Sequence, residues 1–575
     1  MADQAETSIT ATRARRAWLV AALVVLVLAG VLTCAYFFFV GWRARDLAAK
    51  ARANFENANY RMAWMQINSA KNLKPEDPDV LRVMAMVDAA IGRATALDYY
   101  EKLSQKVDLS PEDLKARAGV AARFGSDEQF GQAVEALEKA GEISEAAKLR
   151  AARQVRQGNL DRAIAEARIA ADISGDPAEK LQLARLIVQR YQPEFGEGII
   201  PSAEAVVTID ESVGIIDSLL ATPVRDEALA FGLSEANASP ELRLKWAKTA
   251  MEKPDAQSPA LLPAVTVLVA SGEKTAGEIH AQLRSLFDAT PLESRAAYAQ
   301  FLTGAGMPKE ALALVTAQEA FESNNSFVAR TGALSALKNY DAVLAAVQTG
   351  GNVDADLLLL VKARAEYARG RDAQTGPSAL REAMDAAANL RRIERIISAA
   401  DSLGASALAD EKLVELCGDP GLTDYVFPIA RDRLARRGKF LVLSNAFERA
   451  RDASLQSPAV LDYWRYRSII GGGKTDLAET AAAVASDPAN VSYRVTHALN
   501  ILRQGKPAEA MDAFDGVTVF ANRLTPGQLA VLAAVLSANN DDERALRIVA
   551  AIDPELLEPR EYALIAPLRT GVKAP

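Results

Sequence analysis

The chain has 575 residues, and its 66 lysines and arginines against 74 aspartates and glutamates give a formal net charge of −8. Nucleic-acid binding needs a concentrated basic face, so this balance argues against a nucleic-acid partner. The only cysteines are Cys34 and Cys417, and Cys34 falls in an apolar segment, so an intramolecular disulfide framework is excluded. We expect Cys417 to be a small buried hydrophobic residue rather than a nucleophile.

The first predicted element is a transmembrane helix over residues 17–42, preceded by an N-terminal tail at 1–16. The segment contains no charged residue and is followed directly by Arg43. As a helix, its 26 residues reach roughly 39 Å, which exceeds the roughly 30 Å of a bilayer core. Trp18 and Trp42 stand near its two ends, where indole rings prefer the headgroup layer. The sequence therefore predicts a single-pass membrane anchor.

Two alternatives to a permanent anchor remain at this stage. A cleaved secretory signal has a shorter apolar region, and here the aromatic residues 36–39 stand where a cleavage site belongs. A lipoprotein signal places a small residue before its cysteine, whereas Thr33 precedes Cys34. We therefore read Cys34 as a lipid-facing or interfacial residue.

The sequence gives only weak evidence for which side of the membrane the large body occupies. Three basic residues precede the apolar segment closely and four follow it, so the positive-inside rule does not separate the two orientations. Long domains translocate largely regardless of their charge, so we expect the tail inside and the large body outside. Together with the alanine- and arginine-rich composition, this predicts the cytoplasmic (inner) membrane of a bacterium, with the body on the periplasmic side.

The residues after the anchor are predicted to be helical almost throughout. Apolar residues recur every three or four positions, and β-branched runs are rare, which is typical of an all-α fold. A hydroxyl residue followed by proline recurs as a predicted helix start, because the hydroxyl can cap the helix and proline suits its first turn. These predicted starts are Ser110-Pro111, Ser239-Pro240, Thr290-Pro291 and Thr525-Pro526.

The spacing of small residues predicts stacked helical hairpins. Prolines recur near multiples of 33 or 34 residues, and a period of this length is typical of a helical repeat array. Alanines also stand in pairs twelve residues apart, and small residues let two helices cross closely at a turn. The pairs are Ala51 and Ala63, Ala151 and Ala163, Ala299 and Ala311, and Ala498 and Ala510. Glycines 158, 306 and 505 lie between the members of three pairs, where a first helix should end.

These residues resemble the tetratricopeptide repeat. The segment with Ala51, Tyr60, Ala63 and Ala70 follows the family pattern most closely, and the units around Gly158 and Gly505 repeat it. The resemblance implies an α-solenoid of stacked helix-turn-helix units preceded by one transmembrane helix. The pattern lapses between Pro193 and Arg225, so we expect one array at 43–192, an irregular break or hinge at 193–225, and a degenerate array at 226–575.

Residues that could carry catalysis or bind a metal are scarce. The two histidines, His280 and His497, are far apart in the sequence, and the chain has no Cys/His cluster, so we expect no metal site and no cofactor. The segment 471–475 ends like a phosphate-binding loop, but Ser468 replaces its first glycine, and we interpret it as an inter-helix turn. We therefore do not expect an enzyme, although carboxylates paired across a groove remain an alternative.

The repeat resemblance implies protein–protein interaction. First helices of such hairpins line a continuous concave surface, which suits a peptide segment or another protein. Polar or aromatic residues on first helices near the C-terminus, Asp462, Tyr466 and Arg503, are the candidates for this surface. The predicted function is that of a membrane-anchored scaffold or adaptor. The alternatives are a structural spacer in an envelope assembly, such as polysaccharide export or cell-wall machinery, and an enzyme hidden in a degenerate segment.

Overall fold

The computed structural model describes residues 2–195, 202–288, 290–370, 375–386 and 390–570. Within these residues the chain forms α-helices and short 3-10 helices and no strand, which confirms the all-α class. In the first helix, the side chains of residues 2–25, 27 and 29 lie outside the described set.

The helices before the first 3-10 segment are α1 (Ala2–Glu56), α2 (Tyr60–Leu73), α3 (Pro78–Ala90), α4 (Ala96–Ser104), α5 (Pro111–Phe124), α6 (Asp127–Lys139), α7 (Ile143–Arg156), α8 (Leu160–Ser174) and α9 (Pro177–Tyr191). The following α-helices, as far as the middle of the chain, are α10 (Ala203–Ser218), α11 (Arg225–Ser234), α12 (Pro240–Met251), α13 (Leu261–Ala270), α14 (Ala276–Phe287), α15 (Leu292–Gly304), α16 (Pro308–Leu314), α17 (Asn324–Ala336), α18 (Tyr340–Thr349), α19 (Ala355–Arg369) and α20 (Thr375–Ala386). The remaining α-helices are α21 (Leu390–Ser402), α22 (Ser406–Leu416), α23 (Thr423–Arg436), α24 (Phe440–Ala453), α25 (Pro458–Ile470), α26 (Leu477–Ser486), α27 (Val491–Arg503), α28 (Pro507–Asp512), α29 (Pro526–Ala538), α30 (Asp542–Ala551) and α31 (Pro559–Thr570). The 3-10 segments are η1 (Gln192–Phe195), η2 (Leu219–Ala221), η3 (Glu319–Phe321), η4 (Ala521–Arg523) and η5 (Pro554–Leu556).

Successive helices pair as hairpins, and the hairpins stack. An odd-numbered helix packs on the even-numbered helix that follows it, as in α3 with α4 and α23 with α24. Odd-numbered helices also pack on the next odd-numbered helix, as in α25 with α27 and α27 with α29. The apolar core is correspondingly divided into clusters that neighbouring hairpins share. This is the packing of a helical repeat array, in which each unit buries its apolar face against its neighbours.

Alanine pairs and glycine turns have the structural roles that the sequence predicts. All eight alanines of the four predicted pairs are buried. Gly158, Gly306 and Gly505 end their helices with positive φ angles of 77°, 81° and 77°, a conformation that glycine adopts without steric cost.

Three of the four predicted helix starts are confirmed, and one is wrong. Ser110 and Thr525 form capping boxes with the third helical residue, and Ser239 caps α12. Thr290 caps nothing, because its hydroxyl donates to the Phe287 carbonyl at 3.0 Å and α15 begins after Pro291 without a side-chain cap.

Two compact units divide the chain. The N-terminal unit contains Met1–Arg153 and Ala165–Ser174, and the C-terminal unit contains Gln154–Ile164 and Gly175–Pro575. The division therefore does not fall in the predicted break at 193–225. The described part of that segment includes α10 and η2, and residues 196–201 lie outside the described set. Its β-branched residues are compatible with a helix because Ile209 and Ile216 are buried on one side of α10.

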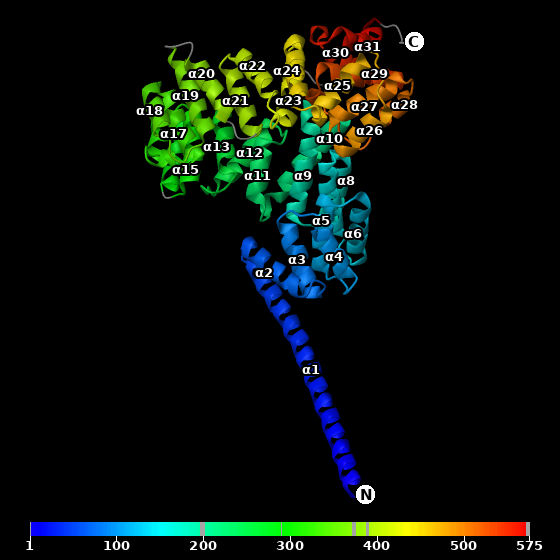
Figure 1. Cartoon of the computed structure of the whole chain (residues 1–575). Coiled ribbons are helices and arrows are strands. Elements are labelled where there is room, and N and C mark those ends of the chain that lie inside the picture. Colours follow the sequence, from blue (N-terminus) through cyan, green and yellow to red (C-terminus); the bar gives the residue numbers. More distant parts are fainter. Residues whose placement is uncertain (1, 196–201, 289, 371–374, 387–389, 571–575) are drawn as a thin grey trace. The chain divides into compact units, whose positions relative to one another are not determined.

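Helix α1 includes the predicted membrane span and extends beyond the other helices of the N-terminal unit (Figure 1). Among the described residues, a search for helices with the length and apolar character to cross a bilayer finds none. The side chains in the first part of 17–42, including that of Trp18, lie outside the described set. At the other end, Trp42 is exposed, as are Cys34 and the aromatic residues 36–39.

A candidate protein-binding groove

An open cavity of about 900 Å³ lies in the C-terminal unit. Its walls come from α9, α11 and the start of α13, and the 522–523 segment closes one end. Helices α9 and α11 each pack on the even-numbered helix that follows them, so they are first helices of hairpins. These two walls of the cavity are therefore on the kind of surface that the repeat resemblance implies for binding. We call this cavity the first-helix groove.

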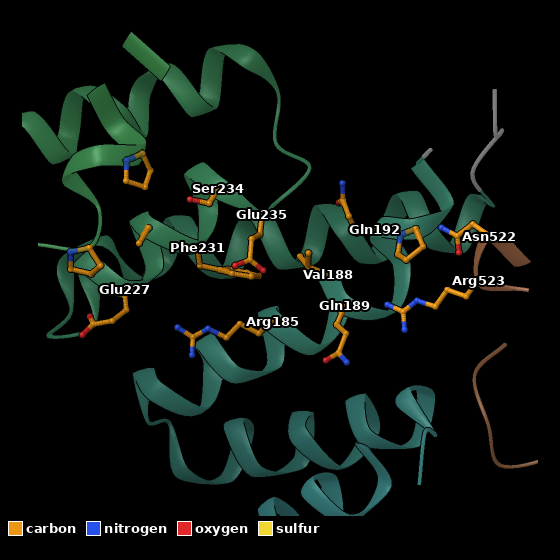
Figure 2. Close-up of a pocket in the computed structure, with 14 residues that line it drawn as sticks. Arg185, Val188, Gln189, Gln192, Glu227, Phe231, Ser234, Glu235, Asn522 and Arg523 are labelled. Carbon is orange, nitrogen blue, oxygen red and sulfur yellow. The ribbon is translucent and has the colours of Figure 1, made fainter. Parts of the chain in front are cut away.

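Helical periodicity brings the lining residues of each wall onto one face. Arg185 and Gln189 on α9 and Gln192 at its C-terminal cap are separated by four and three residues, and all line the groove. Glu227 and Phe231 on α11 and Glu235 at its C-terminal cap recur every four residues. Figure 2 shows Arg185 and Gln189 on one side of the groove and Phe231 and Glu235 on the other, with Asn522 and Arg523 toward one end.

The α11 wall is fixed from behind by a close helix contact. A Cβ atom at Gly232 would lie 2.8 Å from the Trp246 ring, so only glycine lets α11 approach this indole. Trp246 is fully buried, and its Nε1 donates to the Asp217 carboxylate at 3.0 Å. Asp217 also accepts a hydrogen bond from Lys245 at 2.8 Å, and the Lys245 and Trp246 donors lower the Asp217 pKa. Helix α11 therefore presents Phe231 to the groove from a rigid base.

Arg185 supplies the groove with an available positive charge. Its guanidinium lies over the Phe231 ring, with Cζ 5.9 Å from the centroid, and the side chain is exposed. Within the described part of the chain Arg185 has no ion pair. A cation held against an aromatic face and left without a carboxylate can pair with an acidic group of a ligand.

A second cavity of about 320 Å³ shares Gln189 and Arg523 with the first-helix groove. It continues past Asp432 on α23 to Ser492 on α27, and connecting segments such as 489–490 and 517–520 supply much of the rest of its lining. Arg523 is held there by two contacts. Its guanidinium lies 4.7 Å from the Phe520 ring centroid, and its carbonyl accepts a hydrogen bond from Arg436 at 2.5 Å.

Hydrogen bonds between distant segments bound this second cavity. The Thr518 amide donates to the Gly158 carbonyl at 2.8 Å, and the Leu160 amide donates to the Thr518 hydroxyl at 3.0 Å. Gly158 is tightly covered, because a Cβ atom there would lie 3.1 Å from Val517 Cγ2. Arg494 fixes the 513–515 segment by donating to two of its carbonyls at 2.8 Å. We call the Gly158, Leu160 and Thr518 contacts the closure contact.

Two of the three binding residues predicted from sequence are not on an open surface. Asp462 is 3% exposed and Tyr466 is 7% exposed, which corrects the expectation that they line a groove. Both border a cavity of about 30 Å³, which is too small for a peptide. The Tyr466 hydroxyl donates to Glu561 of α31 at 2.8 Å, and a Cβ atom at Gly527 would collide with the same carboxylate. Helices α29 and α31 therefore cover this face of α25.

Burial raises the pKa values of three ionisable side chains at this enclosed cavity, Asp462, Tyr466 and Glu561. Desolvation raises the Asp462 pKa to about 6, although Arg431 lies 3.9 Å away and lowers it in part. Desolvation also raises the Glu561 pKa, and it raises the Tyr466 pKa well above its usual value. These carboxyl groups are enclosed by side chains, so they are not arranged around a space for a substrate.

Arg503, the third predicted residue, is exposed and lies apart from Asp462 and Tyr466. It lines a separate groove of about 600 Å³ between the ends of α27, α29 and α31. Arg185, Phe231 and Arg523 were not among the residues predicted from sequence. The signal that could have found the first of these is the polar series at 185, 189 and 192, which follows one side of α9 to its C-terminal cap.

The histidines, the segment 471–475 and Cys417, which the sequence offered as possible reactive or ligand-binding groups, have roles in packing or in turns. Thr480 Oγ1 lies 2.8 Å from His497 Nδ1, and His280 Nδ1 lies 3.3 Å from the Tyr298 hydroxyl. Segment 471–475 joins α25 to α26, which confirms the predicted turn. Cys417 is fully buried, which raises its thiol pKa to about 12. A search of the described residues finds no group of ligands that could hold a metal ion.

No known protein family and no characterised relative matches the sequence. Solved structures similar to this chain include the APC/C hetero-tetramer Cut9-Hcn1, at 12% identity and a TM-score of 0.31, covering 92% of this chain and 96% of that chain. The yeast Tom70 structure has 14% identity and a TM-score of 0.23, with coverage of 87% and 96%. The maize pentatricopeptide repeat protein PPR10 has 13% identity and a TM-score of 0.30, with coverage of 92% and 91%. The stacked helix pairs of this chain define it as a helical-repeat array.

Proposed function

We propose that this protein is a membrane-anchored scaffold that binds an extended segment of another protein in the first-helix groove. The observation that carries the proposal is the composition of the groove walls. Gln189 and Asn522 offer exposed carboxamides, each of which can donate to a peptide carbonyl and accept from a peptide N–H. Phe231 and Val188 border the same groove as buried apolar side chains, at 6% and 4% exposure, and form part of its base.

Binding is favoured over catalysis by the placement of the titratable groups. The carboxyl groups with raised pKa values, Asp462 and Glu561, border a cavity of about 30 Å³ and not the groove. The groove itself combines amide, apolar and charged side chains. This mixture suits recognition of a polypeptide, in which apolar contact is combined with a few placed polar groups.

We also propose that α1 anchors the protein in a membrane. Support comes from exposed apolar side chains that follow each other along α1 and point in all directions around it. They include Leu32 at 68% exposure and Phe38 at 78%. A helix that is apolar on every side is suited to lipid, because water offers none of its faces a favourable contact. A bacterial inner membrane, with the body outside the cytoplasm, is the location we propose.

Site-specific photocrosslinking tests the groove in the full-length protein in its native membrane. A benzophenone amino acid at position 189 should form adducts with a partner protein, and Arg185→Ala should reduce their yield. The matched control is position 281, an exposed alanine on the second helix α14. Adducts at position 281 but not at 189 would contradict groove binding and would favour the spacer alternative.

Membrane attachment and sidedness need separate tests. Replacing Leu28 and Leu32 together by arginine should release the full-length protein from membranes, because two charges at the bilayer centre are costly. The control is the same pair replaced by isoleucine. A C-terminal reporter that is active only outside the cytoplasm should be active, and an inactive fusion would reverse the proposed orientation.

A further inference from the structure

The first-helix groove carries opposite charges on its two helical walls. Glu227 on α11 and Glu235 at its C-terminal cap line one side, Arg185 on α9 lines the other, and Arg523 lies at one end. All four side chains are exposed. Figure 2 shows Glu235 across the groove from Arg185, and Glu227 toward the end opposite Arg523. The α11 wall is therefore acidic and the α9 wall is basic.

These four charges are available to a ligand. Within the described part of the chain, none of the four side chains forms an ion pair. Nearby charges that do not line the groove are paired. Arg190 of α9 lies 2.8 Å from Asp161, and Lys245 of α12 lies 2.8 Å from Asp217. A ligand in the groove can therefore supply counter-charges that the protein itself does not supply.

Aromatic rings hold both cations of the groove in place. Arg185 Cζ lies 5.9 Å from the Phe231 ring centroid, and Arg523 Cζ lies 4.7 Å from the Phe520 ring centroid. A cation that is already held against a ring loses less conformational freedom when a carboxylate binds it. The positions of the two guanidinium groups are therefore largely set before a ligand arrives.

The spacing of the two carboxylates sets the register of a ligand on the acidic wall. Glu227 and Glu235 are eight residues apart, which is about 12 Å along a helix that rises about 1.5 Å per residue. Four residues of an extended chain span about 13 Å. An extended segment that lies along α11 can therefore place basic residues at its positions i and i+4 against both carboxylates.

Side-chain alternation decides which residues of such a segment meet the basic wall. Successive side chains of an extended chain point to opposite sides. Positions i+1 and i+3 therefore point toward α9 when positions i and i+4 point toward α11. Arg185 can pair with a carboxylate there, and the exposed Gln189 can bond the ligand backbone. The matching segment has basic residues at i and i+4 and an acidic residue at i+1 or i+3.

We infer that the first-helix groove selects an extended protein segment with this alternating charge pattern. The inference rests on the proposed function, because it names the class of segment that the groove binds. A uniformly acidic segment would meet Glu227 and Glu235, and a uniformly basic segment would meet Arg185 and Arg523, so each leaves like charges face to face. A nucleic acid is a poor occupant, because its phosphates would lie against the acidic wall.

Fluorescence anisotropy with the full-length protein in detergent micelles tests the inference. The alternating peptide is a labelled nine-residue probe with lysine at positions 3 and 7, glutamate at positions 4 and 6, and threonine elsewhere. The same-side peptide has the same composition, but its glutamates are at positions 1 and 5, so all four charges point to one side. We expect the alternating peptide to bind at least about tenfold more tightly than the same-side peptide.

Charge reversal of the acidic wall separates recognition from loss of folding. Glu227→Lys combined with Glu235→Lys should weaken binding of the alternating peptide. The same variant should bind a peptide with glutamate at positions 3, 4, 6 and 7 at least about tenfold more tightly than the wild type does. The matched control is Glu241→Lys combined with Glu448→Lys, at exposed glutamates on α12 and α24, which changes the net charge equally. It should keep the wild-type preference.

Three results would overturn the inference. They are equal affinity for the alternating and same-side peptides, no binding of the alternating peptide, and a control variant that gains the glutamate peptide as strongly as the reversed variant does. Crosslinking at position 189 together with any of these results would keep the proposed function and reject only the charge pattern. Adducts at position 281 but not at 189 would reject both.

Discussion

Helices α9 and α25 are both first helices of their hairpins, but their polar faces differ in access. On α9, Arg185 and Gln189 are exposed to a groove of about 900 Å³. On α25, Asp462 and Tyr466 lie under α29 and α31 beside a cavity of about 30 Å³. The difference teaches that a first helix offers a binding surface only where the neighbouring hairpins leave it open. Four predictions test this contrast, beginning with the largest expected effect.

Trp246→Ala should remove the side chain against which α11 packs at Gly232. The indole is fully buried and donates to Asp217, so its loss should lower the free energy of unfolding by about 3–5 kcal/mol. It should also reduce crosslinking at position 189, because α11 would lose its support. Urea denaturation measures the stability. Trp464→Ala, at a tryptophan 51% exposed, is the control and should change it by less than about 0.5 kcal/mol.

Asp462→Asn should change how the stability of the enclosed face depends on pH. The folded-state pKa of about 6 lies above the ordinary aspartate value of 3.8, so the folded state holds this proton where the unfolded state has lost it. Stability from this group is therefore present at low pH and is lost as pH rises from about 4 to about 6. The loss is on the order of 3 kcal/mol.

Denaturation of the wild type and of Asp462→Asn across this pH window measures the effect. The variant should lack this fall in stability, and Asp210→Asn, at an exposed aspartate on α10, should retain it. If wild-type stability rose across the window, Asp462 would be an ordinary ionised partner of Arg431, and the contrast with the open face would weaken.

Thr518→Val should loosen the closure contact that bounds the second cavity. The Leu160 amide would lose its acceptor in a buried place, at a cost of about 1–3 kcal/mol. Hydrogen exchange of the Leu160 amide should accelerate. Thr266→Val, at an exposed threonine that bonds only within α13, provides the comparison. Unchanged exchange at Leu160 would mean that the hydroxyl does not hold this segment.

Arg185→Ala should have the smallest effect and should act on binding alone. The side chain is exposed and has no ion pair among the described residues, so unfolding should change by less than about 0.5 kcal/mol. Crosslinking at position 189 should fall, and the fall should shrink at high salt because screening weakens charge pairing. Arg284→Ala on α14 is the control. Equal yields from both variants would show that the Arg185 charge is not used.

The sequence could predict the local features because each depends on residues close together in the chain. Capping boxes at Ser110 and Thr525 need only a hydroxyl and the residue three positions later. The turn at Gly505 needs only one residue that accepts a positive φ angle. The failure at Thr290 shows the limit, since its hydroxyl bonds backward to Phe287 instead of capping α15.

Access to the site could not be predicted in the same way. Asp462 and Tyr466 have the expected residue types and helix, but Glu561, 95 residues after Tyr466, lies over them. Arg185 and Arg523 share one groove although more than 300 residues separate them. Nothing in the local pattern of either segment specifies these neighbours.

The sequence by itself determined an apolar N-terminal segment, an all-α body and hairpins closed by alanine pairs and glycine turns. These features follow from local sterics, capping and helical periodicity, which act within a few residues. The tertiary structure alone decided which first-helix faces are open, because burial depends on the hairpins that stack above a face and not on the face itself. It covered α25 with α29 and α31, and it left the α9 and α11 walls exposed to the first-helix groove.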